Sequence, residues 1–240
     1  MKIIAHRGDS ASFPENTPES WSAAYANGAY AIEADIRLSQ DGVCVCAHDP
    51  DLRRLFDRPE RPEDLPFDAL IALRSADGGR IVGLADVLVH ARDNRVVLLD
   101  LKDETPAALA AIHTTIEDAV AVDQRRQVIA GCHTLEAVKF FAGLGQTQIL
   151  GFIPDPDAGE AFFEAGAPVI RLWERDVTGA RVAHLQARGA EIWVTTGGAG
   201  TPHRTGDTTP DTLAALAKVG VSGVLVNDVA AAQTILEALS

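Results

Sequence analysis

Two histidines and several acidic residues in the first half of the chain have the types and spacing that acid–base chemistry beside a cation requires. Glu33 and Asp35 are two positions apart in an apolar stretch, so in a strand both side chains point to one face. Two carboxylates in one site are costly unless a cation or a shared proton compensates them, and hard divalent cations prefer such oxygen ligands. His6 and His48 follow other strand-like segments. Histidine can both take and give a proton because its unperturbed pKa is about 6.5.

Cationic residues accompany this set. Arg7 follows His6 directly, and Asp100 and Lys102 are again two positions apart. Such an inventory suits phosphoryl chemistry, in which a metal and cationic side chains stabilise the non-bridging oxygens. One histidine would take a proton from the nucleophile and the other would give one to the departing alkoxide. Each residue alone has a simpler explanation; Lys102, for example, could simply pair with Asp100. Together they indicate a metal-assisted hydrolase acting on a phosphate ester.

Short apolar runs alternate with Ala-rich helical stretches along the chain and would position these residues. The eight candidate strands are residues 3–5, 31–38, 96–101, 127–130, 148–152, 169–172, 191–195 and 223–226. Most are continuous apolar runs, as expected of parallel strands buried on both faces. Helix start signals follow at Thr17-Pro18-Glu19, Thr134-Leu135-Glu136 and Thr209-Pro210-Asp211. The pattern predicts an α/β fold, a (β/α)8 TIM barrel with its catalytic groups at the carboxyl ends of the strands. An open doubly wound sheet is less favoured, because no glycine-rich fingerprint follows the first strand.

The alternation is interrupted after the second strand. Asp41-Gly42 lies between two strand-like runs, which is a hairpin signal. Residues 49–83 are rich in Pro, Arg, Asp and Gly. We interpret residues 39–83 as a small hairpin and loop insertion, and residues 1–240 as one barrel domain.

Composition limits the function classes. A formal charge of −13 argues against a general nucleic-acid binder and does not favour binding to an anionic membrane surface. The N-terminal apolar run is too short for a signal-peptide core, and no segment approaches the roughly twenty apolar residues of a membrane span. The three cysteines, Cys44, Cys46 and Cys132, fit no simple disulfide framework and are interpreted as buried thiols. A cytoplasmic location without stable membrane association is expected; the oligomeric state is left open.

The order and spacing of the motifs resemble the glycerophosphodiester phosphodiesterase family. The resemblance is carried by His6-Arg7-Gly8, Pro14-Glu15-Asn16-Thr17, Glu33-Ala34-Asp35, Asp41-Gly42 and His48-Asp49. It continues more faintly at Leu99-Asp100-Leu101-Lys102, in the Trp-containing strand 192–195 and in the final strand 220–228. Its specificity is therefore greatest in the first fifty-five residues or so.

The resemblance implies a TIM barrel, a divalent cation (Mg2+ or Ca2+) and cleavage of a small-molecule glycerophosphodiester into an alcohol and glycerol 3-phosphate. It also implies roles for individual residues: His6 and His48 as the acid/base pair, Glu33, Asp35 and Asp100 as metal ligands, and Arg7 and Lys102 as the phosphate-binding cations. Asp100 departs from the commoner Glu, which shortens the side chain by one methylene. Glu15, Asn16 and Thr17 are expected to cap the first helix and to hold the His6-Arg7 loop.

Several alternatives stay open at this point. The substrate could be a lysophospholipid or a sugar phosphodiester, or the barrel could bind a phosphate ester without cleaving it. An amidohydrolase is less favoured, because that chemistry usually wants His-rich ligation of a transition metal. His133 is interpreted as structural rather than as part of the pocket. Trp173 and Trp193 fit either a substrate wall or core packing, and the loop with His203 fits either a cover for the site or a solvated segment.

Overall fold

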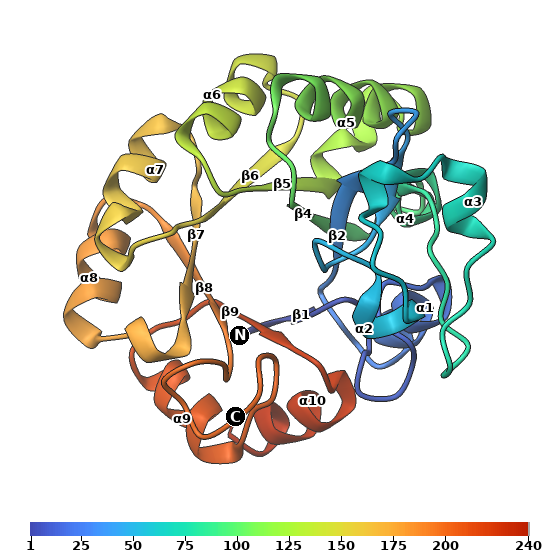
Figure 1. The fold of residues 1–240 in the computed structure, drawn as a ribbon. Coiled ribbons are helices and arrows are strands. Elements are labelled where there is room, and N and C mark those ends of the chain that lie inside the picture. The colour runs from blue at the N-terminus through green and yellow to red at the C-terminus, as the bar shows by residue number, and fades with distance from the viewer. Residues whose placement is uncertain (240) are drawn as a thin grey trace.

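The strands of the chain form a closed ring that is surrounded by helices (Figure 1). A computed structural model describes residues 1–239. Within that range nine strands belong to one sheet, and every pairing is parallel except that of β3 with β2. In ring order the parallel strands are β1 (Lys2–Ala5), β2 (Ala31–Leu38), β4 (Val96–Leu101), β5 (Val128–Cys132), β6 (Gln148–Phe152), β7 (Val169–Trp173), β8 (Glu191–Thr195) and β9 (Gly223–Val226). The ring closes because β1 pairs with both β2 and β9. The predicted (β/α)8 barrel is confirmed.

Helices occupy the outside of the ring between successive strands (Figure 1). They are α1 (Pro18–Ala26), α4 (Leu84–Arg92), α5 (Pro106–Ala119), α6 (Leu135–Leu144), α7 (Gly159–Ala165), α8 (Gly179–Ala187), α9 (Pro210–Lys218) and α10 (Val229–Ala238). The three predicted start signals are confirmed, because the hydroxyls of Thr17, Thr134 and Thr209 accept hydrogen bonds from the first turns of α1, α6 and α9. Across residues 1–239, no helix combines the length and the apolar character needed to cross a membrane.

The predicted hairpin leads into an excursion beside β2. β3 (Cys44–Cys46) pairs antiparallel with β2, with Leu38 opposite Cys44. The excursion also contains α2 (Arg53–Phe56), the 3-10 turn η1 (Pro62–Asp64) and α3 (Phe67–Ile71), so it has more helix than the predicted hairpin and loop. A small apolar cluster of its own holds it, formed by Val45, Leu52, Leu70 and Ile81. That residues 1–240 form a single domain stays a prediction.

The barrel interior has two layers of different chemistry. Its floor is an apolar cluster of one or two side chains from each strand, including Ile4, Ala31, Leu98, Ile129, Leu150, Val169, Trp193 and Leu225. Residues two positions further along a strand point to the same face. The second layer therefore consists of His6, Glu33, Asp100, Gly131, Phe152, Arg171, Thr195 and Asn227. Each of the eight parallel strands thus contributes to the floor and then, towards its carboxyl end or just beyond it, to the layer that carries the polar groups.

One position of the second layer has no side chain. A Cβ at Gly131 would overlap the ring of Phe152 and lie 2.9 Å from the carbonyl oxygen of Leu99. The missing side chain on β5 lets the Phe152 ring lie against the backbone of the neighbouring strands. From the sequence, Trp193 fitted either a substrate wall or core packing. In the structure it belongs to the floor and is 1% exposed.

We expect Gly131→Ala to lower the free energy of unfolding by about 1–3 kcal/mol, because the added methyl group displaces the Phe152 ring. Gly143→Ala is the matched control: Gly143 lies in α6, and an added Cβ meets nothing within 4 Å. This control should gain about 0.5–1 kcal/mol through helix propensity. Urea titrations measure both. A Gly131→Ala variant as stable as the wild type would show that the ring can move at no cost.

Candidate active site and carboxylate cluster

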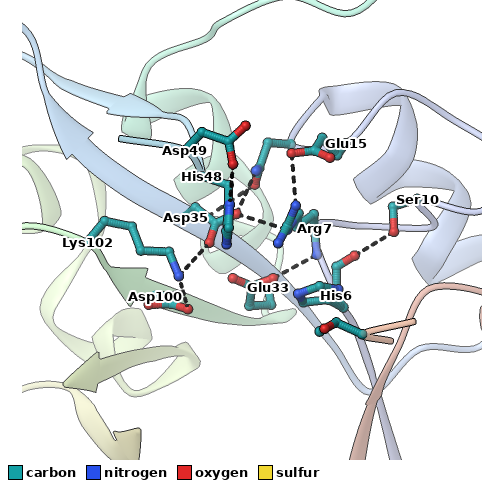
Figure 2. Close-up of polar contacts among 12 residues, drawn as sticks. His6, Arg7, Ser10, Glu15, Glu33, Asp35, His48, Asp49, Asp100 and Lys102 are labelled. Carbon is teal, nitrogen blue, oxygen red and sulfur yellow. Dashed lines mark hydrogen bonds and ion pairs between the residues drawn. The ribbon is translucent and has the colours of Figure 1, made fainter. Parts of the chain in front are cut away.

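Three buried carboxylates meet at the carboxyl ends of β2 and β4. Asp35 on β2 is in register with Asp100 on β4, and Glu33 points to the same face as Asp35. One ligand oxygen from each side chain lies within 4.8 Å of the others. Their exposed fractions are only 1% for Glu33 and Asp35 and 7% for Asp100. The structure therefore brings together the three residues that were predicted to bind a metal (Figure 2).

Two cations lie on either side of Asp35 in Figure 2. Lys102 Nζ is 3.0 Å from Asp35 Oδ1 and 2.6 Å from Asp100 Oδ2. The Arg7 Nε atom lies 3.4 Å from Asp35 Oδ2. Burial by itself raises the pKa of Asp100, but Lys102 and His133 outweigh burial and hold that pKa below its ordinary value. Both predicted phosphate-binding cations thus stand at the cluster, and in this structure they pair with carboxylates.

Of the three carboxylates, Glu33 has the least nearby positive charge to balance its own negative charge. Its Oε2 atom accepts a 2.7 Å hydrogen bond from the Arg7 backbone N–H. Its Oε1 atom is buried and has no hydrogen-bond partner in the part of the chain that the structure describes. Burial, followed by the charges of Asp35 and Asp100, raises the pKa of Glu33 well above its ordinary value. The cluster lacks positive charge at this oxygen, so a hard divalent cation fits the site.

The loops after β1 and before α1 hold these groups in place. The Asn16 side chain donates to Asp35 Oδ2 at 2.8 Å and accepts from the Asp35 backbone N–H at 3.1 Å. The Asn16 backbone N–H donates to the Arg7 carbonyl at 3.0 Å. Arg7 and Asn16 both have positive φ, 60° and 56°, and Gly8 follows with φ 83° where a Cβ would overlap Ser20. Asn16 thus positions a carboxylate as well as the loop.

His6 is fixed by an amide whose orientation can be assigned. Asn227 Nδ2 lies 2.8 Å from the Thr205 carbonyl and 3.1 Å from Asp207 Oδ1, both acceptors, so Asn227 Oδ1 faces the other way. That oxygen lies 2.8 Å from His6 Nδ1 and accepts its proton. Burial and the charge of Arg7 lower the pKa of His6 to about 4. The ring is therefore neutral at pH 7, with its lone pair on Nε2.

His48 has an ionic partner instead. It lies just beyond β3 rather than in it, and its Nδ1 atom is 2.8 Å from Asp49 Oδ1. Although burial opposes it, hydrogen bonds from Arg54 and His48 lower the pKa of Asp49. Arg54 is in turn held by Glu15 at 2.7 Å. The two histidines lie on different sides of the carboxylate cluster in Figure 2.

A cavity of about 300 Å³ opens above the cluster. Among the predicted site residues, its lining includes His6, Arg7, Glu33, His48, Asp100 and Lys102, while Asp35 lies beneath them. The structure thus assembles all seven predicted site residues in one place. Their chemical roles stay predictions, because geometry alone does not test them.

The opposite wall of the cavity was largely missed. His133, interpreted as structural from the sequence, lines the cavity and places Nε2 at 2.7 Å from Asp100 Oδ1. Arg171, which lies on the same wall, and Asn227, which instead holds His6, were not singled out at all. The two-residue repeat of a strand could have identified both residues. Arg171 lies two positions after the floor residue Val169, and Asn227 lies two positions after Leu225. Trp173 also lines this wall. In the loop after β8, Thr205 lines the cavity.

Comparisons with known proteins agree with this geometry. The model of the glycerophosphoryl diester phosphodiesterase family matches residues 6–146, more than half of the chain. A glycerophosphodiester phosphodiesterase 1 from Mus musculus is 34% identical over 122 residues, covering 47% of this chain and 37% of that protein. A probable glycerophosphodiester phosphodiesterase 1 from Mycobacterium tuberculosis is 46% identical over 52 residues, covering 22% and 19%. The matched part of the chain thus spans well under half of the length of these curated relatives.

Solved structures show the same fold over nearly the whole chain. A glycerophosphodiester phosphodiesterase from Thermotoga maritima aligns with a TM-score of 0.78 and 21% identity, covering 97% of both chains. A phosphodiesterase from Oleispira antarctica aligns with a TM-score of 0.85 and 19% identity, covering 99% of this chain and 97% of that one. The family match extends over the ends of β1, β2 and β4 and the segment just beyond β3, which together carry the carboxylates, the two histidines and both cations. The chain belongs to the glycerophosphoryl diester phosphodiesterase family.

Proposed function

We propose that this chain is a metal-dependent phosphodiesterase that hydrolyses glycerophosphodiesters to an alcohol and glycerol 3-phosphate. The observation that carries the proposal is the cavity in which His6 and His48 flank a buried carboxylate cluster with an uncompensated oxygen. The Oleispira antarctica phosphodiesterase of the same fold is described in complex with the product sn-glycerol-3-phosphate, which supports the substrate class.

His6 is the proposed general base. Its Nδ1–H is committed to Asn227, which leaves Nε2 without a proton and open to the cavity. A neutral imidazole in this state takes the proton of the attacking water or hydroxyl. The low pKa keeps His6 in the basic form, and the hydrogen bond to Asn227 fixes which nitrogen acts.

His48 is the proposed general acid. Asp49 accepts from Nδ1, orients the ring and stabilises it when it carries two protons. The proton on Nε2 then goes to the departing alkoxide. Arg54 and Glu15 fix Asp49 in turn, so the acid is supported by a network on the insertion side of the barrel.

The phosphate would lie between the two histidines. Glu33, Asp35 and Asp100 would hold Mg2+ or Ca2+, and that cation supplies positive charge for the non-bridging oxygens of the diester. Arg7 and Lys102 would add hydrogen bonds to the same oxygens once the cation takes over their carboxylates. The composition-based expectations of a cytoplasmic protein without a nucleic-acid partner stay predictions.

The alternatives to hydrolysis of soluble diesters are less well supported. A barrel that only binds a phosphate ester does not need two histidines that are each fixed at Nδ1 by a separate partner, Asn227 for His6 and Asp49 for His48. The cavity carries charge on several sides, through Arg7, Lys102 and Asp100, which suits a polar substrate better than an acyl chain.

We expect metal-stripped protein to cleave glycerophosphodiesters only after Mg2+, Ca2+ or Mn2+ is added, with release of glycerol 3-phosphate. His6→Ala and His48→Ala should each lower kcat by at least about a hundredfold, since each removes one proton transfer. His184→Ala, at an exposed histidine on α8, is the control. If no diester is cleaved with any metal, the proposed function is wrong. Near-wild-type turnover in either site variant would remove that histidine from the mechanism.

The lowered pKa of His6 predicts a pH-dependent loss of stability. In the unfolded chain His6 binds a proton below about pH 6.5, but in the folded chain only below about pH 4. Stability is therefore complete above pH 6.5 and is lost as pH falls towards 4, by up to about 3 kcal/mol from this group. Urea titrations should show the wild type losing this amount relative to His6→Gln, and not relative to His184→Gln. Parallel pH curves for wild type and His6→Gln would contradict the assignment.

We expect Mg2+ or Ca2+ to raise the melting temperature of the wild type, because the cation binds the folded cluster and not the unfolded chain. A saturating cation at a hundred times its Kd contributes about 2.7 kcal/mol. Glu33→Gln retains an acceptor for the Arg7 N–H but removes the uncompensated charge, so its melting temperature should respond far less. Glu164→Gln on the exposed face of α7 should respond like the wild type. An equal response of all three proteins would place the cation elsewhere.

A further inference from the structure

Arg171 is a buried cation that lacks an acceptor. It lies in the middle of β7, lines the cavity and is 5% exposed. Its Nε and Nη1 atoms are buried and find no hydrogen-bond partner among residues 1–239. Burial lowers its pKa to about 10, so the guanidinium is still charged at neutral pH. Burying an unpaired charge is expensive unless a partner arrives, and the cavity is the open side from which a partner can come.

Aromatic rings fix the guanidinium without satisfying it. Its Cζ lies 4.2 Å from the ring centroid of Trp173 and 4.9 Å from that of Phe152. Such faces attract a cation but accept no conventional hydrogen bond. Phe152 also stacks on His133, with 5.0 Å between centroids and 12° between planes, and His133 reaches Asp100. These contacts form one wall that runs from the carboxylate cluster to Arg171.

The phosphate does not need this charge. Together with Asp35, the side chains around the cavity carry three carboxylates and, besides Arg171, the cations Arg7 and Lys102. A divalent metal ion would leave one positive charge over, which the single negative charge of a phosphodiester offsets. Asp176, whose charge also acts on Arg171, has its own partner in Arg175 at 3.7 Å. The charge of Arg171 is then surplus, and Arg171 stands on β7, across the ring from β2 (Figure 1).

We propose that Arg171 determines substrate specificity by binding an anionic substituent, a carboxylate or a phosphate, on the alcohol part of the diester. The inference rests on the proposed function and adds the class of alcohol to it. A quaternary ammonium head group is disfavoured, because the guanidinium already stands over the Trp173 and Phe152 rings that would otherwise attract it. A planar fork of donors matches a carboxylate or phosphate in two hydrogen bonds.

A matched pair of substrates tests this without any mutation. The first is the glycerophosphodiester of 3-hydroxypropionate and the second is that of 3-hydroxypropionamide, which has nearly the same shape and no charge. The holoenzyme should cleave the carboxylate with a kcat/KM at least about tenfold higher, the range of a hydrogen bond between charged groups. A diester of 3-hydroxypropyl phosphate should also exceed the amide, and glycerophosphocholine should be the poorest of the four. Equal kcat/KM values for the carboxylate and the amide overturn the proposal.

Variants assign the effect to the residue. Arg171→Met should abolish the preference for the carboxylate and leave turnover of the amide within about threefold, because an acceptor without charge gains less from a guanidinium. Arg175→Met is the control: Arg175 also lies over Trp173, at 5.9 Å, but its side chain is 42% exposed. It should keep the preference. A uniform loss on all four substrates in Arg171→Met would show that Arg171 binds the shared phosphoglycerol part instead.

The outcomes separate this inference from the proposed function. If no diester is hydrolysed, the proposed function fails, and calorimetric titration of the same carboxylate and amide pair still decides the assignment. Tighter binding of the carboxylate, by about tenfold, supports Arg171 as an anion-binding residue, and equal affinities overturn it. If Arg171→Met does not fold, as judged by circular dichroism, the comparison of the two substrates on the wild-type protein is decisive by itself.

Discussion

The burial of three carboxylates at the ends of two neighbouring strands is the constraint on which the rest of the site depends. Glu33, Asp35 and Asp100 repel one another, and burial removes the water that would screen them. Lys102 and Arg7 compensate part of this charge but leave one oxygen of Glu33 without a hydrogen-bond partner among residues 1–239. The site is therefore an incomplete electrostatic arrangement, and a cation is the simplest group that completes it.

The apolar floor of the barrel supports this layer of buried charges from below. Ile4, Leu98 and Trp193 fill the interior beneath the polar layer and exclude water from below. The polar groups then face solvent only through the cavity, where charge interactions are stronger than in open water. The same strands carry the floor and the site, so packing in the core also sets the positions of the reacting groups.

Much of the fold and most of the candidate site could be predicted from the sequence. Apolar runs and threonine N-caps indicated the barrel, because both signals depend on local structure alone. Groups close in sequence, such as Glu33 and Asp35, were found by spacing. His133, Arg171 and Asn227 depend on which strands are neighbours, and on contacts between residues far apart in the chain, such as Asn227 with His6. Arg171 lies within an apolar strand and could have been recognised from the sequence, because the alternation of side chains along a strand places it on the interior face.

The order of strands around the ring has a consequence for how this protein can diversify. β1, β2, β4 and the segment just beyond β3 hold the groups proposed for chemistry, whereas β6 and β7 hold Phe152, Arg171 and Trp173 on the far wall. The groups proposed for chemistry and those of the far wall thus lie largely in separate parts of the chain, although Asn227, which fixes His6, follows β9. Recombination that exchanges only β6 and β7 between relatives would change the far wall, while the groups proposed for chemistry and the Asn227 that fixes His6 are inherited unchanged.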